Sequence, residues 1–239
     1  MRHSDWGEAD RLLVLLTRER GKIRCIAKGV RRLRSRKAGH LEPFTHAALL
    51  LAKGRDFWIV TQAETLDAYL PLREDLVRTG YAAYVIELVD RFTYDEGATR
   101  GLFSLLLDTL RRITAAEDVF LAVRYFELRL LELVGFRPEL FRCVMCSEEV
   151  RPQDQFFSPL RGGVVCPKCG PQVMAARAIS VEMLKFLRHL QRSSYAEATR
   201  ARLTPAIQHE MEVLLQHYIT YLLERGLNSP DFLNEVRKK

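Results

Sequence analysis

Two Cys-x-x-Cys pairs constrain this chain more than any other feature of its sequence. Cys143 and Cys146 form the first pair, and Cys166 and Cys169 form the second after nineteen intervening residues. Each pair places two thiolates on one edge of a tight turn, and two such turns supply the four tetrahedral ligands that zinc prefers. Four protein ligands leave no open position for water, so we expect one structural Zn²⁺ that holds residues 138–174 in shape.

Alternatives to this interpretation stay open. Two disulfides would need an oxidising compartment, and a redox Cys-x-x-Cys would not need a second copy. Arg142, Arg161 and Lys168 lie beside the pairs and either offset the charge of a tetrathiolate centre or contact phosphate. The fifth cysteine, Cys25, lies two residues from Ile23 in a strand-like run, so we expect a buried apolar residue rather than a reactive thiol.

The densest positive charge lies between residues 18 and 37. Ten basic residues and one acidic residue, Glu19, give this segment a charge of +9, whereas the whole chain carries +7. Clustered guanidinium and ammonium groups bind a phosphate backbone because they release its counterions. A solvated charged loop without a ligand is the alternative. The predicted DNA-binding residues are Arg18, Arg20, Lys22, Arg24, Lys28, Arg31, Arg32, Arg34, Arg36 and Lys37.

Apolar and alternating runs predict an N-terminal β domain over residues 1–71. Strands are expected at residues 12–17, 22–27, 46–52 and 57–66, with Gly21 completing the loop between the first two. Small all-β units usually close into a barrel, which protects their edges. Residues 1–10 show no convincing strand pattern, so we expect the barrel to lack its first strand and to have an open edge.

A helical period replaces the strand pattern after Pro71. Helices are expected at residues 76–92, 101–113, 117–134, 180–190 and 205–225. Thr204 is the expected N-cap of the last of these, with Arg225 in its final turn and Gly226 beyond its end. The predicted fold class is therefore α+β, with a helical domain over residues 72–239 into which the zinc-binding segment 138–174 is inserted.

Motifs of common enzyme classes are missing. The chain has no phosphate-binding glycine loop, no nucleophile elbow and no His-Glu-x-x-His pair, so we expect no enzymatic activity. His209 and His217 have no cysteine neighbour and are expected at the surface or at an interface. No apolar run reaches the ~20 residues that span a bilayer, and no secretory signal is visible, so we expect a cytoplasmic location.

Four stretches, in this order and spacing, resemble the RecO family of bacterial DNA repair proteins. They are GEADRLLVLLTRERGKIRCIAKGVRR near the start, TQAE at 61–64, YAAYVIELVDR at 81–91 and FELRLLELVGFRPELFRCVMC at 126–146. The resemblance implies an N-terminal OB fold, a helical C-terminal domain and a structural zinc centre that some members lack. Family chains usually carry a further strand's length before the equivalent of Arg2, so we expect the true start to lie upstream of Met1.

The resemblance also implies a non-catalytic role in recombinational repair at the bacterial nucleoid. Family members bind single- and double-stranded DNA, anneal complementary strands, and act with RecR and RecF to load RecA onto strands coated by single-strand-binding protein. Aromatic residues that could stack on bases are few, with Trp6 and Phe44 near the basic segment and Trp58 expected in the core. The alternative is a protein-interaction adaptor whose basic and apolar surfaces capture partner proteins, with DNA contact secondary.

Overall fold

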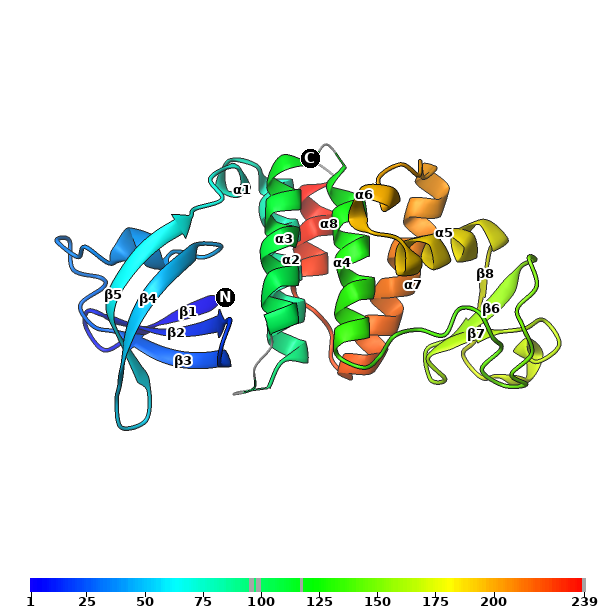
Figure 1. The fold of residues 1–239 in the computed structure, drawn as a ribbon, viewed down its shortest axis with the longest axis horizontal. Helices are drawn as coiled ribbons and strands as arrows, with labels where there is room; N and C mark the ends of the chain where they lie inside the picture. The colour runs from blue at the N-terminus through cyan, green and yellow to red at the C-terminus, as the bar shows by residue number, and fades with distance from the viewer. Residues whose placement is uncertain (95–96, 98–99, 117, 238–239) are drawn as a thin grey trace. The chain divides into compact units, whose positions relative to one another are not determined.

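The computed structural model describes residues 1–94, 97, 100–116 and 118–237. These residues form two compact units (Figure 1). Met1–Glu117 together with Asn228–Lys239 is the first unit, and Asp118–Leu227 is the second. No helix in the described part of the chain combines the length and the apolar character that a membrane crossing needs.

The first unit begins with a five-stranded sheet in the order β1-β2-β3-β5-β4. Its strands are β1 (Arg2–Trp6), β2 (Asp10–Thr17), β3 (Gly21–Ala27), β4 (His46–Lys53) and β5 (Trp58–Asp67). β3 and β5 are parallel and the other neighbours are antiparallel, so β1 and β4 are the two edges. The predicted loop between β2 and β3 closes at Gly21, whose φ of +66° suits a residue without a Cβ.

β1 shows that the prediction of no strand within residues 1–10 was wrong. Four of its five residues are exposed, so no alternation of buried and exposed side chains marks it in the sequence. The strand is held instead by its backbone ladder with β2, which runs from Arg2 opposite Val14 to Trp6 opposite Asp10. An edge strand of this kind depends on backbone pairing with its neighbour and not on a pattern of buried side chains.

One face of this sheet carries an apolar core. Leu13, Ile23 and Cys25 are at most 3% exposed, and Trp58 packs against them. The predictions for Cys25 and Trp58 as core residues are therefore confirmed. Burial raises the pKa of the Cys25 thiol to about 12, so this sulfur stays protonated and unreactive near neutral pH.

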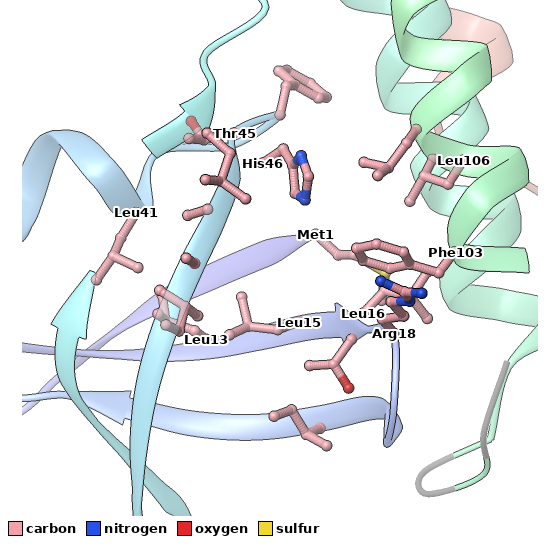
Figure 2. Close-up of a pocket in the computed structure, with 18 of the residues that line it drawn as sticks. Met1, Leu13, Leu15, Leu16, Arg18, Leu41, Thr45, His46, Phe103 and Leu106 are labelled. Carbon is pink, nitrogen blue, oxygen red and sulfur yellow. The ribbon is translucent and has the colours of Figure 1, made fainter. Parts of the chain in front are cut away.

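A cavity of about 970 Å³ opens beside this core (Figure 2). Leu13 and Leu15 line it from the sheet, and Phe103 and Leu106 point toward it from α3 (Arg100–Ala115). The cavity thus lies within the first unit, between the sheet and a helix.

The described part of the first unit holds three further α-helices, α1 (Pro71–Glu74), α2 (Leu76–Phe92) and α8 (Ser229–Val236), and a 3-10 helix at Ala38–Leu41. Asp75 caps α2 by accepting hydrogen bonds from the backbone N–H groups of Val77 and Arg78. α8 packs against α2. Gly80 permits this close approach, because a Cβ there would lie 2.7 Å from a methyl carbon of Leu233.

The second unit combines helices with a small sheet. Three helices, α4 (Val119–Leu133), α5 (Val181–Arg192) and α7 (Pro205–Leu223), pack against one another, and the short α6 (Tyr195–Ala198) follows α5. A sheet in the order β7-β6-β8 joins β6 (Gln155–Ser158), β7 (Gly163–Val165) and β8 (Arg177–Ile179). These strands have three or four residues, which is too short for a periodic signal in the sequence.

The helix boundaries follow the predictions closely, with one correction. Thr204 caps α7 as predicted, by accepting a hydrogen bond from the N–H of Ile207. However, α7 ends at Leu223 because Glu224 takes a left-handed conformation, so Arg225 lies beyond the final turn. The start predicted for α4 at residue 117 lies outside the described residues, and Asp118 is the N-cap of that helix.

Candidate metal centre and nucleic-acid interface

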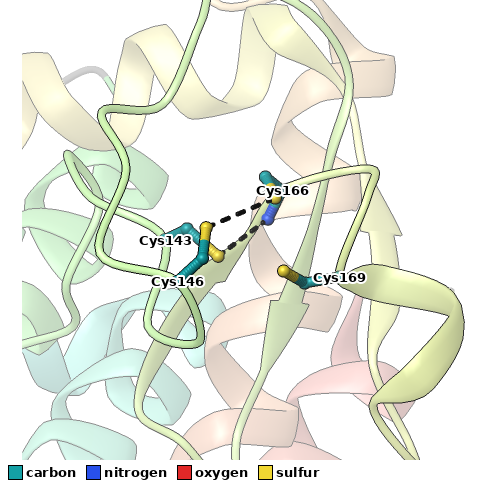
Figure 3. Close-up of side chains that lie close together, drawn as sticks. All are labelled: Cys143, Cys146, Cys166 and Cys169. Carbon is teal, nitrogen blue, oxygen red and sulfur yellow. Dashed lines mark hydrogen bonds between the residues drawn. The ribbon is translucent and has the colours of Figure 1, made fainter.

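The four cysteines of the two pairs converge on one point of the second unit (Figure 3). Their Sγ atoms all lie within 4.8 Å of one another, and those of Cys146 and Cys166 are 3.9 Å apart. A tetrahedral zinc ion with Zn–S bonds of about 2.3 Å separates its sulfurs by about 3.8 Å, whereas bonded disulfide sulfurs are about 2.05 Å apart. All four thiols are free, so the cluster has the dimensions of a four-sulfur metal site.

Two tight turns aim the thiols toward each other. In the first turn, the N–H of Ser147 donates to the carbonyl of Cys143 at 2.8 Å. In the second turn, directly after β7, the N–H groups of Cys169 and Gly170 donate to the carbonyl of Cys166 at 3.0 and 2.8 Å. Each turn therefore presents both thiols of its pair from one edge, as the spacing of the pairs predicts.

Backbone contacts join the two turns. The N–H of Val144 donates to the carbonyl of Val164 at 2.9 Å, and the N–H of Cys166 donates to the Sγ of Cys143 at 3.3 Å. Gly163 permits this approach, because a Cβ there would lie 2.6 Å from the carbonyl oxygen of Glu139. The cluster is thus built by the backbone of two segments that are distant in the sequence.

The thiols of the cluster differ in acidity. Burial acts to raise the pKa of Cys143, but hydrogen bonds from backbone N–H groups, including those of Cys146 and Cys166, outweigh it and lower this pKa to about 6. The pKa of Cys169 is raised to about 12, first by its hydrogen bond with the Cys166 thiol and then by burial. Four thiolates at this spacing repel one another, so a divalent cation fits the cluster and would let all four deprotonate.

α5 anchors the first turn through two arginines that the sequence did not indicate. Nε of Arg188 donates to the carbonyl of Leu140 at 2.8 Å, across 48 residues of sequence. The guanidinium groups of Arg188 and Arg192 lie 5.0 and 3.8 Å from the ring centroid of Phe141. The flanking cations Arg142, Arg161 and Lys168, which the sequence did indicate, are all exposed.

The ten predicted DNA-binding residues lie on the β2–β3 hairpin and on the loop after β3. Eight of them are exposed, and Lys22 and Lys37 are half-buried. The exposed members are Arg18, Arg20, Arg24, Lys28, Arg31, Arg32, Arg34 and Arg36. The structure therefore brings the basic segment to the surface of the first unit.

The two half-buried lysines make contacts within the fold. Nζ of Lys22 donates to the carbonyl of Asp90 at 2.9 Å and lies 3.3 Å from its carboxylate, which also pairs with Arg2 at 3.3 Å. Nζ of Lys37 donates to the carbonyl of Val60 at 3.0 Å. Both ammonium groups are already bonded, so a phosphate would have to compete for them.

The exposed arginines differ in how firmly they are held. Arg31 pairs with Asp5 at 3.2 Å, and the guanidinium of Arg20 lies 4.8 Å from the ring centroid of Trp58. By contrast, the side chains of four cations form no ion pair with any residue that the structure describes, and these are Lys28, Arg32, Arg34 and Arg36. All four lie in the loop after β3.

A family model described as "Recombination protein O C terminal" matches residues 73–231, and one described as "Recombination protein O N terminal" matches residues 1–69. The chain belongs to the RecO family of DNA repair proteins. This result confirms the family that the four sequence stretches indicated.

Individual RecO proteins are similar over almost the whole chain. A DNA repair protein RecO from Roseiflexus sp. (strain RS-1) is 43% identical over 238 residues, which cover 100% of this chain and 84% of that protein. One from Dehalococcoides mccartyi is 36% identical over 225 residues, which cover 94% of this chain and 88% of the relative. One from Symbiobacterium thermophilum is 36% identical over 240 residues, covering 99% and 95%.

Proposed function

We propose that this chain is a DNA-binding recombination mediator and strand-annealing protein of recombinational repair. The observation that carries the proposal is the exposed basic segment of residues 18–37, with a charge of +9, in a chain of the RecO family. Such a surface binds phosphates through counterion release and carries little sequence preference, as annealing of arbitrary strands requires.

The proposed fold of the N-terminal domain, residues 1–71, is the OB fold, followed by a helical domain over residues 72–239. The strand order β1-β2-β3-β5-β4, with β3 and β5 parallel, supports this assignment. The OB fold is a five-stranded, partly open barrel whose second and third strands form a face for oligonucleotides. β2 and β3 flank the first part of the basic segment here.

Within the segment, we assign the first phosphate contacts to the exposed cations that form no ion pair with a described residue, namely Lys28, Arg32, Arg34 and Arg36. The remaining six predicted residues would contribute through the local field or after rearrangement of their present contacts. Single- and double-stranded DNA share the phosphate backbone, so the same surface serves both.

We assign the cysteine cluster to one structural Zn²⁺ held by Cys143, Cys146, Cys166 and Cys169. The all-sulfur donor set and the 3.9 Å spacing of the Cys146 and Cys166 sulfurs support this assignment. When bound, the ion would cross-link the two turns, and its four protein ligands would leave no position for a substrate.

Family membership supports partners that belong to the same process. We propose that the chain acts with RecR and single-strand-binding protein, and indirectly with RecF and RecA, in loading RecA onto coated strands in the cytoplasm at the nucleoid. The second candidate is the adaptor function, in which partner capture is primary. The apolar cavity of the first unit favours it, because a basic loop alone would need no such cavity.

Fluorescence anisotropy of a labelled single-stranded oligonucleotide across a salt series, with the complementary strand added afterwards, tests the proposal. We expect salt-dependent binding followed by accelerated annealing. Arg32→Glu with Arg34→Glu should weaken binding and reduce the salt slope by about 0.7 per lost contact. Arg200→Glu with Arg202→Glu, two exposed arginines of the second unit, is the matched control and should bind as the parent does. Unchanged DNA affinity with lost partner capture in the first pair would establish the adaptor function instead.

A further inference from the structure

β4 is an edge of the five-stranded sheet with an open ladder. Its sequence, HAALLLAK, is mostly apolar. One side of the strand pairs with β5 along its whole length, from His46 opposite Asp67 to Lys53 opposite Trp58. On the other side, no strand among the described residues pairs with it. A long apolar edge of this kind is a template onto which another extended chain can add.

β2 is open over part of the same region. The ladder between β1 and β2 begins at Arg2 opposite Val14, whereas β2 continues to Thr17. Leu15 and Leu16 are therefore paired with β3 on one side and have no β1 partner on the other. Both residues line the cavity, as does most of β4, so these two strands border the same space.

The cavity between these strands and α3 has the size and the apolar walls that suit an extended peptide segment. Figure 2 shows Leu15 on the sheet side and Phe103 and Leu106 reaching toward it from α3. Its volume of about 970 Å³ is open to an extended segment, and a chain of four residues is about 13 Å long in this conformation. In a strand, the side chains at alternate positions point to the same face. The apolar walls of the cavity would accept the side chains of one such face.

The charged groups around the cavity favour an anionic ligand. Arg18 lies at the cavity in Figure 2, and Arg2 and Arg20 also line it. The acidic residues in the lining, Glu19 and Glu42, each lie within ion-pair distance of an arginine. Arg18 is exposed, and among the described residues its one ion-pair partner is Glu19 at 4.0 Å, so its guanidinium is open to a carboxylate that arrives with a ligand.

His46, the first residue of β4, supplies a neutral polar group to the lining of the cavity. Burial lowers the pKa of its imidazole, and Arg111 lowers it further although Asp67 opposes this. Its ring meets that of Phe103 edge to face, with centroids 5.8 Å apart. His46 therefore adds no positive charge to the cavity near neutral pH, so the guanidinium of Arg18 is the group that we assign to an anionic ligand.

We propose that this cavity binds an extended peptide of a partner protein, which adds as a strand to β4 and places a carboxylate beside Arg18. The peptide has apolar side chains at alternate positions, which enter the cavity between β2 and α3. Its backbone pairs with the free edge of β4. Arg18 belongs to the basic segment, but the site lies apart from the loop after β3 to which the first phosphate contacts are assigned, so it provides a second surface for a protein partner.

A fluorescein-labelled synthetic peptide of sequence TVTITVDD is a suitable probe for the full chain. We expect saturable binding by anisotropy, and slower backbone hydrogen exchange in residues 46–53 when the peptide is bound. Two matched peptides dissect the contact. One carries N-methyl groups on alternate backbone amides and cannot pair with a strand. The other ends in NN, and because all three peptides are amidated at the C-terminus it has no carboxylate. Each should bind about tenfold more weakly than the parent peptide.

Variants locate the site. Ser104→Trp fills the cavity from an exposed position of α3 that lines it, whereas Ala115→Trp at the end of the same helix does not reach the lining. The first should abolish peptide binding and the second should leave it unchanged. Arg18→Glu should weaken binding of TVTITVDD about tenfold while leaving the NN peptide unaffected.

Several outcomes would overturn the proposal. These are equal binding of the N-methylated peptide, unaltered exchange of residues 46–53, or full binding by the Ser104→Trp variant. Protection of residues 46–53 that rises with protein concentration in the absence of peptide would instead show a second copy on this edge. Oligonucleotide binding by the Ser104→Trp variant should stay at the parent level, so a failure here is distinguishable from a failure of the DNA-binding proposal.

Discussion

Glu87 in α2 holds the N-terminus of α8 through Ser229. Its Oε2 accepts hydrogen bonds from the N–H and the hydroxyl of Ser229 at 2.9 and 2.6 Å, across 142 residues of sequence. The N–H of Asn228 also donates to this carboxylate, at 3.0 Å, while the Asn228 side chain makes no capping bond. A carboxylate from another helix therefore replaces the local N-cap and ties the C-terminal helix to the first unit.

Glu87→Gln should destabilise the chain by about 1–3 kcal/mol, because the backbone and hydroxyl donors at the start of α8 would lose a charged acceptor. Urea unfolding at neutral pH measures this change. Glu64→Gln, at an exposed position of β5, is the control and should stay within about 0.5 kcal/mol of the parent. Equal stability of the Glu87→Gln and Glu64→Gln variants would contradict the capping role.

The same carboxylate should contribute to acid unfolding. Burial acts to raise the pKa of Glu87, but hydrogen bonds from Ser229 and Asn228 outweigh it and hold this pKa below its ordinary 4.5. A lowered folded-state pKa stabilises the fold above the ordinary value, and this contribution is lost as the pH falls through the lower one. The free energy of unfolding of Glu87→Gln should therefore fall less steeply than that of the parent below about pH 4.5.

Cys143→Ser should abolish binding of the Zn²⁺ that we propose for the cysteine cluster and should loosen the second unit. Zinc content, measured by atomic absorption, should fall from about one ion per chain to near zero, because a closed tetrahedral site does not tolerate loss of a thiolate. The melting temperature should drop by several degrees. Cys25→Ala changes the cysteine that lies in the sheet core and should keep the full zinc content. Retention of zinc by the Cys143→Ser variant would exclude Cys143 as a ligand.

Members of the basic segment should separate into those that stabilise the fold and those that bind DNA. Lys37→Gln should lower the free energy of unfolding by about 1–3 kcal/mol, because it removes a charged donor from the carbonyl of Val60. Arg34→Gln, at an exposed position, should change stability by less than about 0.5 kcal/mol and weaken oligonucleotide binding. Urea unfolding and anisotropy on both variants test this division. The reverse pattern would contradict it.

Removing one partner of a buried ion pair in the second unit should lower the free energy of unfolding strongly. Nη2 of Arg124 lies 3.2 Å from Glu127 and 3.9 Å from Glu212, and the side chains of Arg124 and Glu127 are fully buried. Arg124→Met should destabilise the chain by about 3–5 kcal/mol, since it leaves a carboxylate buried without this partner. Adding Glu127→Gln should recover much of that loss in urea unfolding. A double variant as unstable as Arg124→Met alone would contradict this account.

Local sequence determined the elements whose causes are local. The sequence predicts the apolar runs of β2 to β5, the N-cap Thr204 and the turn at Gly21. In each case the side chain acts on backbone groups only a few residues away. The convergence of Cys143, Cys146, Cys166 and Cys169 was predictable for a related reason. Metal ligation demands a particular donor set and spacing, so the chemistry constrains the fold before the fold is known.

Tertiary structure alone decided the features that depend on contacts without a signature in the local sequence. β1 has exposed side chains and exists because β2 offers it a ladder, and Glu87 caps α8 because α2 lies beside it. The basic segment was visible as charge, but its division between Lys22 and Lys37, which bond to the fold, and the exposed arginines depended on which carbonyls and carboxylates came within reach. Such contacts leave no periodicity in a sequence, because hydrogen bonds and ion pairs act over a few ångströms of space and not along the chain.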